Sequence, residues 1–183
     1  MKHEERVQPE REFGYSAVGM ALARGEPNRI VGCSEDTRRV RSKRIGFIAG
    51  CFDPFPHPGQ LWAMSQAVEC GECDSIVIAL HADPSLERPE KSRVYMTIEE
   101  RLLMLKSLRW TEEVLVYHRE CELLEILQQV APDVRILGDD YQGKPFTGHE
   151  LPIRVFFAKR REDWSATTFR ERIAKGQFVE AES

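Results

Sequence analysis

The chain has 183 residues, of which 42% are hydrophobic and 31% charged, a mixture and a length that suit one soluble domain with a sizeable core. Its formal net charge of -4 at pH 7 gives no reason to expect a nucleic-acid partner, and no apolar run is long enough to cross a membrane. The first residues lack the apolar segment of a signal peptide and the five cysteines are mostly scattered, so we expect a cytoplasmic protein.

Residues 1–43 are polar, are interrupted by glycines and prolines, and show no repeat. We predict a flexible extension there, a folded domain over residues 44–176 and a tail over residues 177–183. The pair Cys70-Gly-Glu-Cys73 has CxxC spacing, but a zinc site would require a second pair, and this one follows a helix instead of opening it. It is interpreted as a helix end and a turn.

From residue 44 onward, apolar runs of strand length alternate with segments of helical spacing. The predicted strands cover residues 45–49, 75–80, 114–117, 134–137 and 153–158. The predicted helices cover residues 61–70, the segment after a capping Thr97, residues 120–130, and residues 166–175 after a capping Ser165. This alternation predicts an α/β fold with a five-stranded parallel sheet and helices on both faces. Ligands of such sheets bind beyond the carboxyl ends of the strands.

The segment between the first strand and the first helix is Gly50-Cys-Phe-Asp-Pro-Phe-Pro-His-Pro-Gly-Gln60. A glycine lets the backbone approach a phosphate, and the unpaired N–H groups at a helix start attract anions. His57 in such a loop can donate to a phosphate oxygen. A proline-rich loop with a solvated histidine is the alternative that these residues alone leave open.

This segment resembles the GTFD-x-x-H-x-G-H loop of the nucleotidyltransferase superfamily typified by glycerol-3-phosphate cytidylyltransferase. Further similar segments follow in the family's order, at residues 83–91, 97–101, 138–144 and 164–168. The resemblance implies a Rossmann-like nucleotidyltransferase fold. It also implies a homodimer that transfers CMP from CTP to a small phosphorylated alcohol, with release of pyrophosphate and without a covalent enzyme intermediate.

The same resemblance implies the functional residues. The catalytic residues would be His57, Gln60, Lys91 and Arg101, with Arg101 contacting a phosphate from its helix. The nucleotide would be bound by Gly50, Cys51, Phe52, Asp53, Gly138, Asp139, Asp140, Arg160, Ser165 and Thr167. Lys91 and Arg93 would bind the acceptor or the leaving phosphate. Asp53 would help to hold a Mg²⁺ ion on the triphosphate, which shares the task of stabilising negative charge.

The sequence departs from the family pattern at Gln60, which stands where the family has its second histidine. One extra residue also separates Asp53 from His57. Glutamine donates only a neutral hydrogen bond, and charge-assisted hydrogen bonds are about twice as strong. A catalytically impaired nucleotide-binding regulator is therefore the alternative to an active enzyme. We favour the enzyme because the other phosphate contacts are retained.

The donor base is the second open point. The turn at residues 138–141 and the segment at residues 164–167 resemble the cytidylyl branch, which favours CTP over ATP. Family members with similar loops transfer AMP instead, including those that act on pantetheine phosphate, nicotinate mononucleotide and heptose phosphate. The start Gly50-Cys-Phe-Asp53 also occurs in the heptose type.

Overall fold

The computed structural model describes residues 42–91, 93–161 and 164–177. The predicted extension over residues 1–43 and the predicted tail over residues 177–183 lie almost wholly outside these ranges, and both stay predictions. One compact unit begins at Arg41 and contains every element described below. Within the described ranges, none of the helices combines the length and the apolar character that a membrane span requires.

Five parallel strands form one sheet in the order β3-β2-β1-β4-β5. The strands are β1 (Ile45–Gly50), β2 (Ser75–His81), β3 (Thr111–Tyr117), β4 (Val134–Gly138) and β5 (Arg154–Ala158). β2 is buried along its whole length, as its continuous apolar sequence indicates. The predicted five-stranded parallel sheet is confirmed. The third strand begins three residues earlier than predicted, because the exposed Glu112 and Glu113 interrupt its apolar run.

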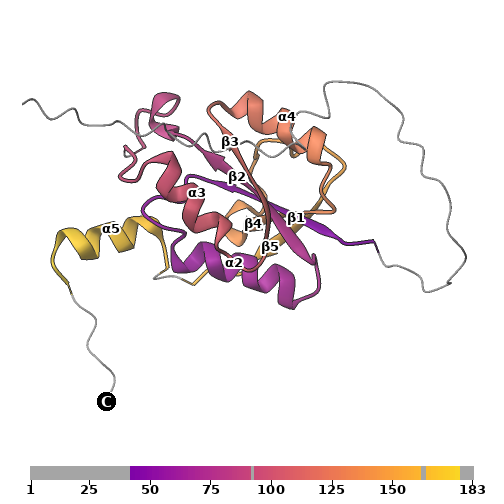
Figure 1. Cartoon of the computed structure of the whole chain (residues 1–183), viewed down its shortest axis with the longest axis horizontal. Coiled ribbons are helices and arrows are strands. Elements are labelled where there is room, and N and C mark those ends of the chain that lie inside the picture. Colours follow the sequence, from indigo (N-terminus) through magenta and orange to yellow (C-terminus); the bar gives the residue numbers. More distant parts are fainter. Residues whose placement is uncertain (1–41, 92, 162–163, 178–183) are drawn as a thin grey trace, which may run out of the picture. The chain divides into compact units, whose positions relative to one another are not determined.

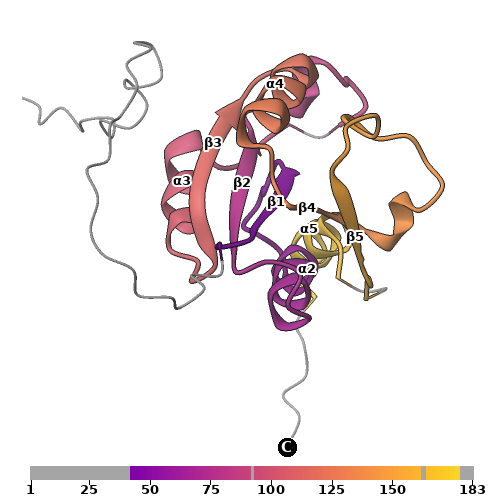
Figure 2. The ribbon, with the colours of Figure 1, turned by 90° about the vertical axis from the view of Figure 1, so that its right-hand side faces the viewer.

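Helices cover both faces of the sheet, as predicted (Figure 2). On one face lie α2 (Pro58–Glu69) and α3 (Ile98–Lys106), which contribute Met64 and Leu105 to a core shared with β1, β2 and β4. On the other face lies α4 (Glu120–Val130), which packs Leu123 and Leu127 against β1 and β2. The sheet is therefore the middle layer of three.

The helix starts follow local capping signals. Thr97 and Glu100 form the capping box that the sequence predicted for α3. α2 begins at Pro58, three residues before the predicted start, because His57 is the N-cap and proline is well suited to the first helical position. α2 ends at Glu69 with Cys70 as its C-cap, which agrees with the interpretation of the CxxC pair as a helix end.

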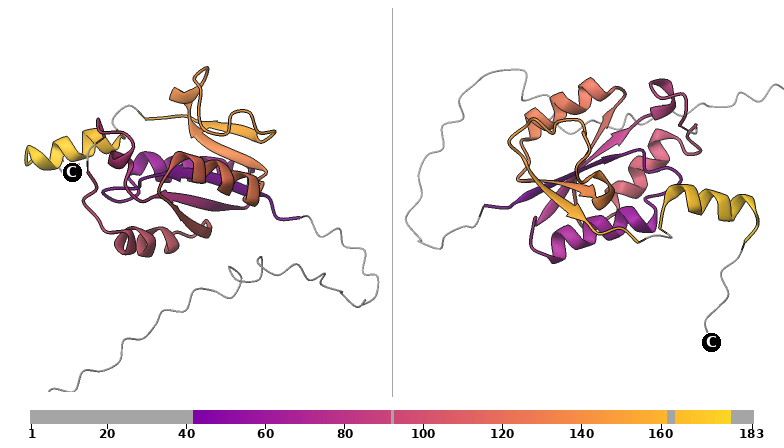
Figure 3. Two further views of the ribbon diagram at one scale, coloured as in Figure 1. Left: turned by 90° about the horizontal axis from the view of Figure 1, so that it is seen from above. Right: turned by 180° about the vertical axis from the view of Figure 1, so that it is seen from behind.

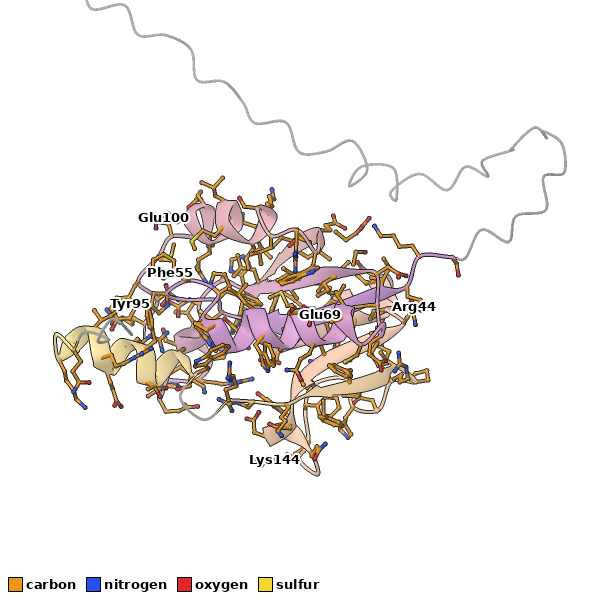
Figure 4. The ribbon with its side chains drawn as sticks, turned by 90° about the horizontal axis from the view of Figure 1, so that it is seen from below. Arg44, Phe55, Glu69, Tyr95, Glu100 and Lys144 are labelled. Carbon is orange, nitrogen blue, oxygen red and sulfur yellow. The ribbon has the colours of Figure 1, made fainter. Side chains whose placement is uncertain are left out.

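The carboxyl ends of the strands carry the loops that matter for function. The short 3₁₀ helices η1 (Pro84–Leu86) and η2 (Asp139–Tyr141) follow β2 and β4, and α5 (Ala166–Ala174) extends beyond this edge of the sheet (Figures 1 and 3). The strand order reverses at β1, which lies between β2 and β4. A ligand crevice is therefore expected between the carboxyl ends of β1 and β4. Figure 4 shows Phe55 and Tyr95 at this edge near α5, and Arg44 at the opposite end of β1.

Candidate functional site

A cavity of about 1050 Å³ opens at the carboxyl ends of β1 and β4. This volume lies at the upper end of the range for small-ligand pockets and is compatible with two small substrates bound side by side. Most of the residues that the sequence analysis singled out line it: Gly50, Cys51, Phe52, Asp53, His57, Gln60, Lys91, Gly138, Asp140, Arg160 and Thr167. Four others, Arg93, Arg101, Asp139 and Ser165, are not among its lining residues.

His57 uses one ring nitrogen to hold the start of α2. Its Nδ1 accepts a hydrogen bond from the Gly59 N–H at 3.1 Å, so in the neutral ring the proton lies on Nε2. The pKa of His57 falls from 6.5 to about 4, first because burial disfavours the charged ring and second because Arg160 and Arg170 are close. His57 therefore enters the cavity wall as a neutral N–H donor at neutral pH.

Gln60 completes the capping box of α2. Its Oε1 accepts a hydrogen bond from the His57 backbone N–H at 3.2 Å. Its Nε2 would lie 3.2 Å from a Cβ placed on Gly50, so the amide N–H₂ group faces the glycine turn at the end of β1. Gln60 thus offers a neutral donor beside the turn while its oxygen is engaged.

The starts of α2 and α5 lie side by side. A Cβ added to Gly59 would overlap the carbonyl oxygen of Trp164, so glycine permits the close approach of the segment that leads into α5. Ser165 caps α5, as predicted, by accepting from the Thr168 N–H at 3.0 Å. Its hydroxyl also pairs with that of Thr168, whereas Thr167 lines the cavity. Two helix N-termini therefore flank one cavity, an arrangement that favours anions.

Asp53 has a structural role that the sequence analysis did not foresee. It is 4% exposed, and its Oδ1 accepts hydrogen bonds from the backbone N–H groups of Tyr95 and Met96 at 2.9 and 2.8 Å. Its Oδ2 lies 3.4 Å from Nη2 of Arg170. Asp53 thereby ties the β1 loop to the segment before α3 and to α5.

These contacts do not fit a metal ion held by the protein. Both Asp53 carboxylate oxygens already have partners, and the described residues contain no group of three His, Cys, Asp or Glu side chains placed to hold a metal ion. Mg²⁺ is a hard cation that takes several oxygen ligands, so one engaged carboxylate is a poor site for it. The Mg²⁺ ion is therefore a prediction that no side-chain cluster among these residues supports.

The geometry does not support the expectation that Arg101 contacts a phosphate. Arg101 is 1% exposed, and its Nη1 donates to the carbonyl oxygens of Cys51 and His81, both at 2.9 Å. Its Nη2 donates to the carbonyl oxygen of Ala82 at 2.7 Å, and its Nε donates to that of Thr97. All three nitrogens are thus engaged with backbone. Arg101 joins the ends of β1 and β2 to α3 and acts as a positioning residue.

The turn after β4 places some of its predicted residues in the cavity wall and others outside it. A Cβ added to Gly138 would overlap a carboxylate oxygen of Asp140, so a larger residue there would displace this side chain. Asp140 forms an ion pair with Arg160 at 2.8 Å, which joins η2 to the residues after β5. Asp140 and Arg160 line the cavity together, whereas Asp139 begins the 3₁₀ helix outside the lining.

Of the two residues predicted to bind the acceptor substrate, Lys91 and Arg93, only one lines the cavity. Lys91 is exposed and lines the cavity, whereas Arg93 is exposed and lies outside the lining. Only Lys91 is therefore placed to meet a ligand in this arrangement.

Several positively charged cavity residues were missed by the sequence analysis, among them Arg170 and Arg135. Arg170 lies three residues after Thr167 on α5, so both side chains share one face of the helix, and this spacing was the available signal. Arg135 is the one charged residue in the run Val134-Arg-Ile-Leu137 and also lines the cavity. A charge within an apolar strand was the signal there.

Comparisons with known proteins agree with this geometry. The family model described as cytidylyltransferase-like matches residues 47–172. The bifunctional protein HldE of Wolinella succinogenes is 33% identical over 118 residues, which cover 64% of this chain and 24% of HldE. HldE of Rhodospirillum rubrum is 31% identical over 172 residues, which cover 88% of this chain and 34% of HldE. The chain thus spans only about a quarter to a third of these curated relatives.

A solved structure gives a weaker likeness. The lipopolysaccharide core biosynthesis protein from Thermoplasma volcanium is 19% identical with a TM-score of 0.49, and the match covers 65% of this chain and 97% of that one. The family model alone spans more than half of the chain and includes the β1 loop, the turn after β4 and the start of α5. The chain therefore belongs to the cytidylyltransferase-like family of nucleotidyltransferases.

Proposed function

We propose that this chain transfers a nucleoside monophosphate from a nucleoside triphosphate to the phosphate group of a small acceptor and releases pyrophosphate. One observation carries the proposal: the glycine turn after β1 and the adjacent N-termini of α2 and α5 open into the same cavity. Backbone N–H groups at helix starts are suited to bind the oxygens of a polyphosphate. The size of the cavity allows donor and acceptor to bind together.

The chemistry requires positioning and charge stabilisation without a covalent intermediate. The acceptor phosphate attacks the α-phosphate in line, and negative charge is held on the α-phosphate and on the leaving pyrophosphate. The neutral Nε2–H of His57 and the amide of Gln60 are donors on the α2 side. Lys91, Arg160 and Arg170 supply positive charge around the cavity. A Mg²⁺ ion, where it accompanies the triphosphate, would neutralise part of that charge.

Two donors have specific support. CTP is supported by the resemblance of residues 138–141 and 164–167 to the cytidylyl branch. ATP is supported by the HldE relatives and by the start Gly50-Cys-Phe-Asp53, which resembles the heptose type; with ATP the acceptor would be a sugar phosphate instead of a glycerol-3-phosphate-like alcohol. A thermal-shift comparison separates the two, because a ligand at a hundred times its dissociation constant stabilises the fold by about 2.7 kcal/mol.

Turnover is tested by pyrophosphate release with CTP or ATP and a panel of phosphorylated alcohols and sugar phosphates. The proposal expects release with one donor and at least one acceptor. Tight nucleotide binding without release for any acceptor would support the impaired regulator instead. Gln60→His tests the same alternative, since an added charged donor is expected to speed the chemical step.

The remaining expectations from the sequence stay predictions: a homodimer, a cytoplasmic location, and no nucleic-acid or membrane partner. Size-exclusion chromatography with light scattering measures the first of them directly.

A further inference from the structure

The cavity continues from the helix starts into a second region on the α4 side of the sheet. This region, here named the Arg135 lobe, is lined by residues of β2, β3, β4, α4 and the segment 139–153 that joins β4 to β5. Its lining includes His81, Tyr117, Leu123, Arg135, Phe146 and Thr147, and the carboxylates Glu120 and Glu150 line the same cavity. The proposed triphosphate would contact Gly50, His57 and the other residues at the opposite side of the cavity. It would leave the Arg135 lobe without an assigned ligand.

Arg135 is a buried charge with few partners. It is 4% exposed, and among the described residues its one hydrogen bond runs from Nη1 to the carbonyl oxygen of Thr147. Its guanidinium carbon lies 5.4 Å from the centre of the Phe146 ring. Nε is buried without a partner, and no described residue accepts from Nη2. An arginine has five N–H donors, and the hydrogen bond to Thr147 uses one of them.

The nearby carboxylates are engaged elsewhere. Glu120 pairs with Arg88 through Oε1 and accepts from the Thr147 hydroxyl at 2.7 Å through Oε2. Glu150 lies 3.1 Å from Nδ1 of His149, a nitrogen that also faces the carbonyl oxygen of Phe146 at 3.0 Å. Among the described residues no carboxylate lies within ion-pair distance of Arg135, and burial lowers the pKa of its guanidinium despite the Glu120 and Glu150 charges. A buried charge is costly unless it is paired, so a pairing group is expected from outside the chain.

We propose that the Arg135 lobe binds a second oxyanion of the acceptor, a carboxylate or a phosphate, at the end remote from the phosphate that reacts. This proposal rests on the function proposed above and narrows its acceptor class. The guanidinium is planar and carries paired N–H donors that match such oxyanions. The acceptor is therefore a molecule with two anionic ends, not a neutral-tailed phosphorylated alcohol.

The position of Arg135 on β4 indicates where the remote end of that acceptor would lie. Arg135 lies three residues before Gly138, which is at the rim of the sheet, and a strand rises about 3.3 Å per residue. About 10 Å along the strand thus separates the two, part of which the arginine side chain spans. The two anionic groups of the acceptor are therefore expected at opposite ends of the molecule and not on neighbouring carbons.

Matched pairs of probes test the proposal by calorimetric binding, without turnover. 6-Phosphogluconate and sorbitol 6-phosphate differ in one terminal carboxylate, and fructose 1,6-bisphosphate and fructose 6-phosphate differ in one phosphate. In at least one pair we expect the dianionic member to bind about tenfold or more tightly, as for a charge-assisted pair. The pair that shows the preference identifies the oxyanion as carboxylate or phosphate.

Variants then assign the preference to Arg135. Arg135→Met is expected to abolish it while leaving the affinity of the singly anionic probe within about twofold, and Arg135→Lys is expected to retain part of it. Arg154→Met removes an exposed arginine outside the cavity and is expected to change nothing. Circular dichroism and nucleotide binding show that each variant is folded.

Equal affinities within both pairs for the wild-type chain, or no binding of any probe, would overturn the proposal even if Arg135→Met failed to fold. A preference that survives in Arg135→Met would overturn it as well. Pyrophosphate release is measured separately, so a subsite without turnover and turnover without a subsite are distinct results.

Discussion

His57 illustrates how one side chain serves both the fold and the site. Nδ1 holds the start of α2 by accepting from Gly59, so Nε2 carries the proton in the neutral ring. Protonation would place a donor where Nδ1 now accepts, and burial and two arginines oppose the charge as well. Both effects keep the imidazole neutral until the pH is well below 6.5.

This depressed pKa predicts how stability depends on pH. As the pH falls below 6.5, the unfolded chain takes up a proton at position 57 before the folded chain does, so stability is lost between about pH 6.5 and 4. His57→Asn retains a residue that can cap α2 and does not titrate. We expect urea denaturation to show a shallower loss of stability for the variant over this range. Identical pH profiles would contradict the depressed pKa.

Gln60 is the clearest departure from the family pattern. The substitution Gln60→Glu distinguishes the capping role of its oxygen from the role of its N–H₂ group beside the glycine turn. A carboxylate at this position keeps the capping bond to the His57 N–H and is favourable at a helix start, so stability is expected to change by less than about 0.5 kcal/mol. The same charge faces the glycine turn and repels a triphosphate. We expect the affinity for CTP or ATP to fall about tenfold or more, measured by calorimetry.

Gln128→Glu, on the exposed side of α4, is the matched control for net charge and is expected to bind nucleotide normally. Unchanged nucleotide affinity in Gln60→Glu would mean that no phosphate lies beside Gln60.

The proposed site for the nucleotide donor depends on the contact between α2 and the segment before α5. Gly59→Ala places a methyl group against the Trp164 carbonyl oxygen, and a backbone atom cannot move aside as a flexible side chain does. We expect the two helix starts to separate, the KM for the triphosphate to rise about tenfold or more, and stability to fall by about 1–3 kcal/mol.

Gly143→Ala is the control because nothing lies within 4 Å of an added Cβ there, although its φ of +72° makes alanine strained. It is expected to lose stability without a change in KM. Equal effects of the two variants on KM would count against a shared donor site at the two helix starts.

The elements were predictable where local signals act alone. Among the described residues, the alternation of apolar runs and helical spacing predicted each strand and each α-helix but neither 3₁₀ helix, and the Thr97–Glu100 box is as predicted. The start of α2 was predicted too late because proline and glycine argue against a helix by propensity, whereas position 58 is the N1 site that tolerates proline.

The side-chain roles were less predictable because their partners are distant in sequence. In the sequence, Arg101 looks like a surface charge on a helix. In the fold it donates to carbonyl oxygens that are 50 and 20 residues away along the chain. The family resemblance implies that Asp53 is a Mg²⁺ ligand, but its carboxylate accepts from backbone N–H groups 42 and 43 residues later in the chain. Only the folded structure shows that the Arg101 guanidinium and the Asp53 carboxylate form their hydrogen bonds with the backbone of the surrounding loops.

At the scale of the whole molecule, Arg101 is the residue that joins the separate parts of the active edge. One guanidinium meets carbonyl groups after β1, at the end of β2 and before α3. The loops that shape the cavity are thus held by a charge that is not itself in the cavity wall.

Arg101→Met separates this positioning role from the phosphate contact that the family resemblance implied. Removing the guanidinium leaves buried carbonyl groups without donors, which costs about 3–5 kcal/mol and lowers the melting temperature by about 10 °C or more. This loss is expected in the absence of nucleotide, by scanning calorimetry. Arg93→Met, at an exposed position outside the cavity, is expected to melt within about 2 °C of the wild type. If Arg101→Met instead kept its melting temperature and lost only nucleotide affinity, the guanidinium would have to reach a phosphate in solution, and the carbonyl network would not be what holds this edge together.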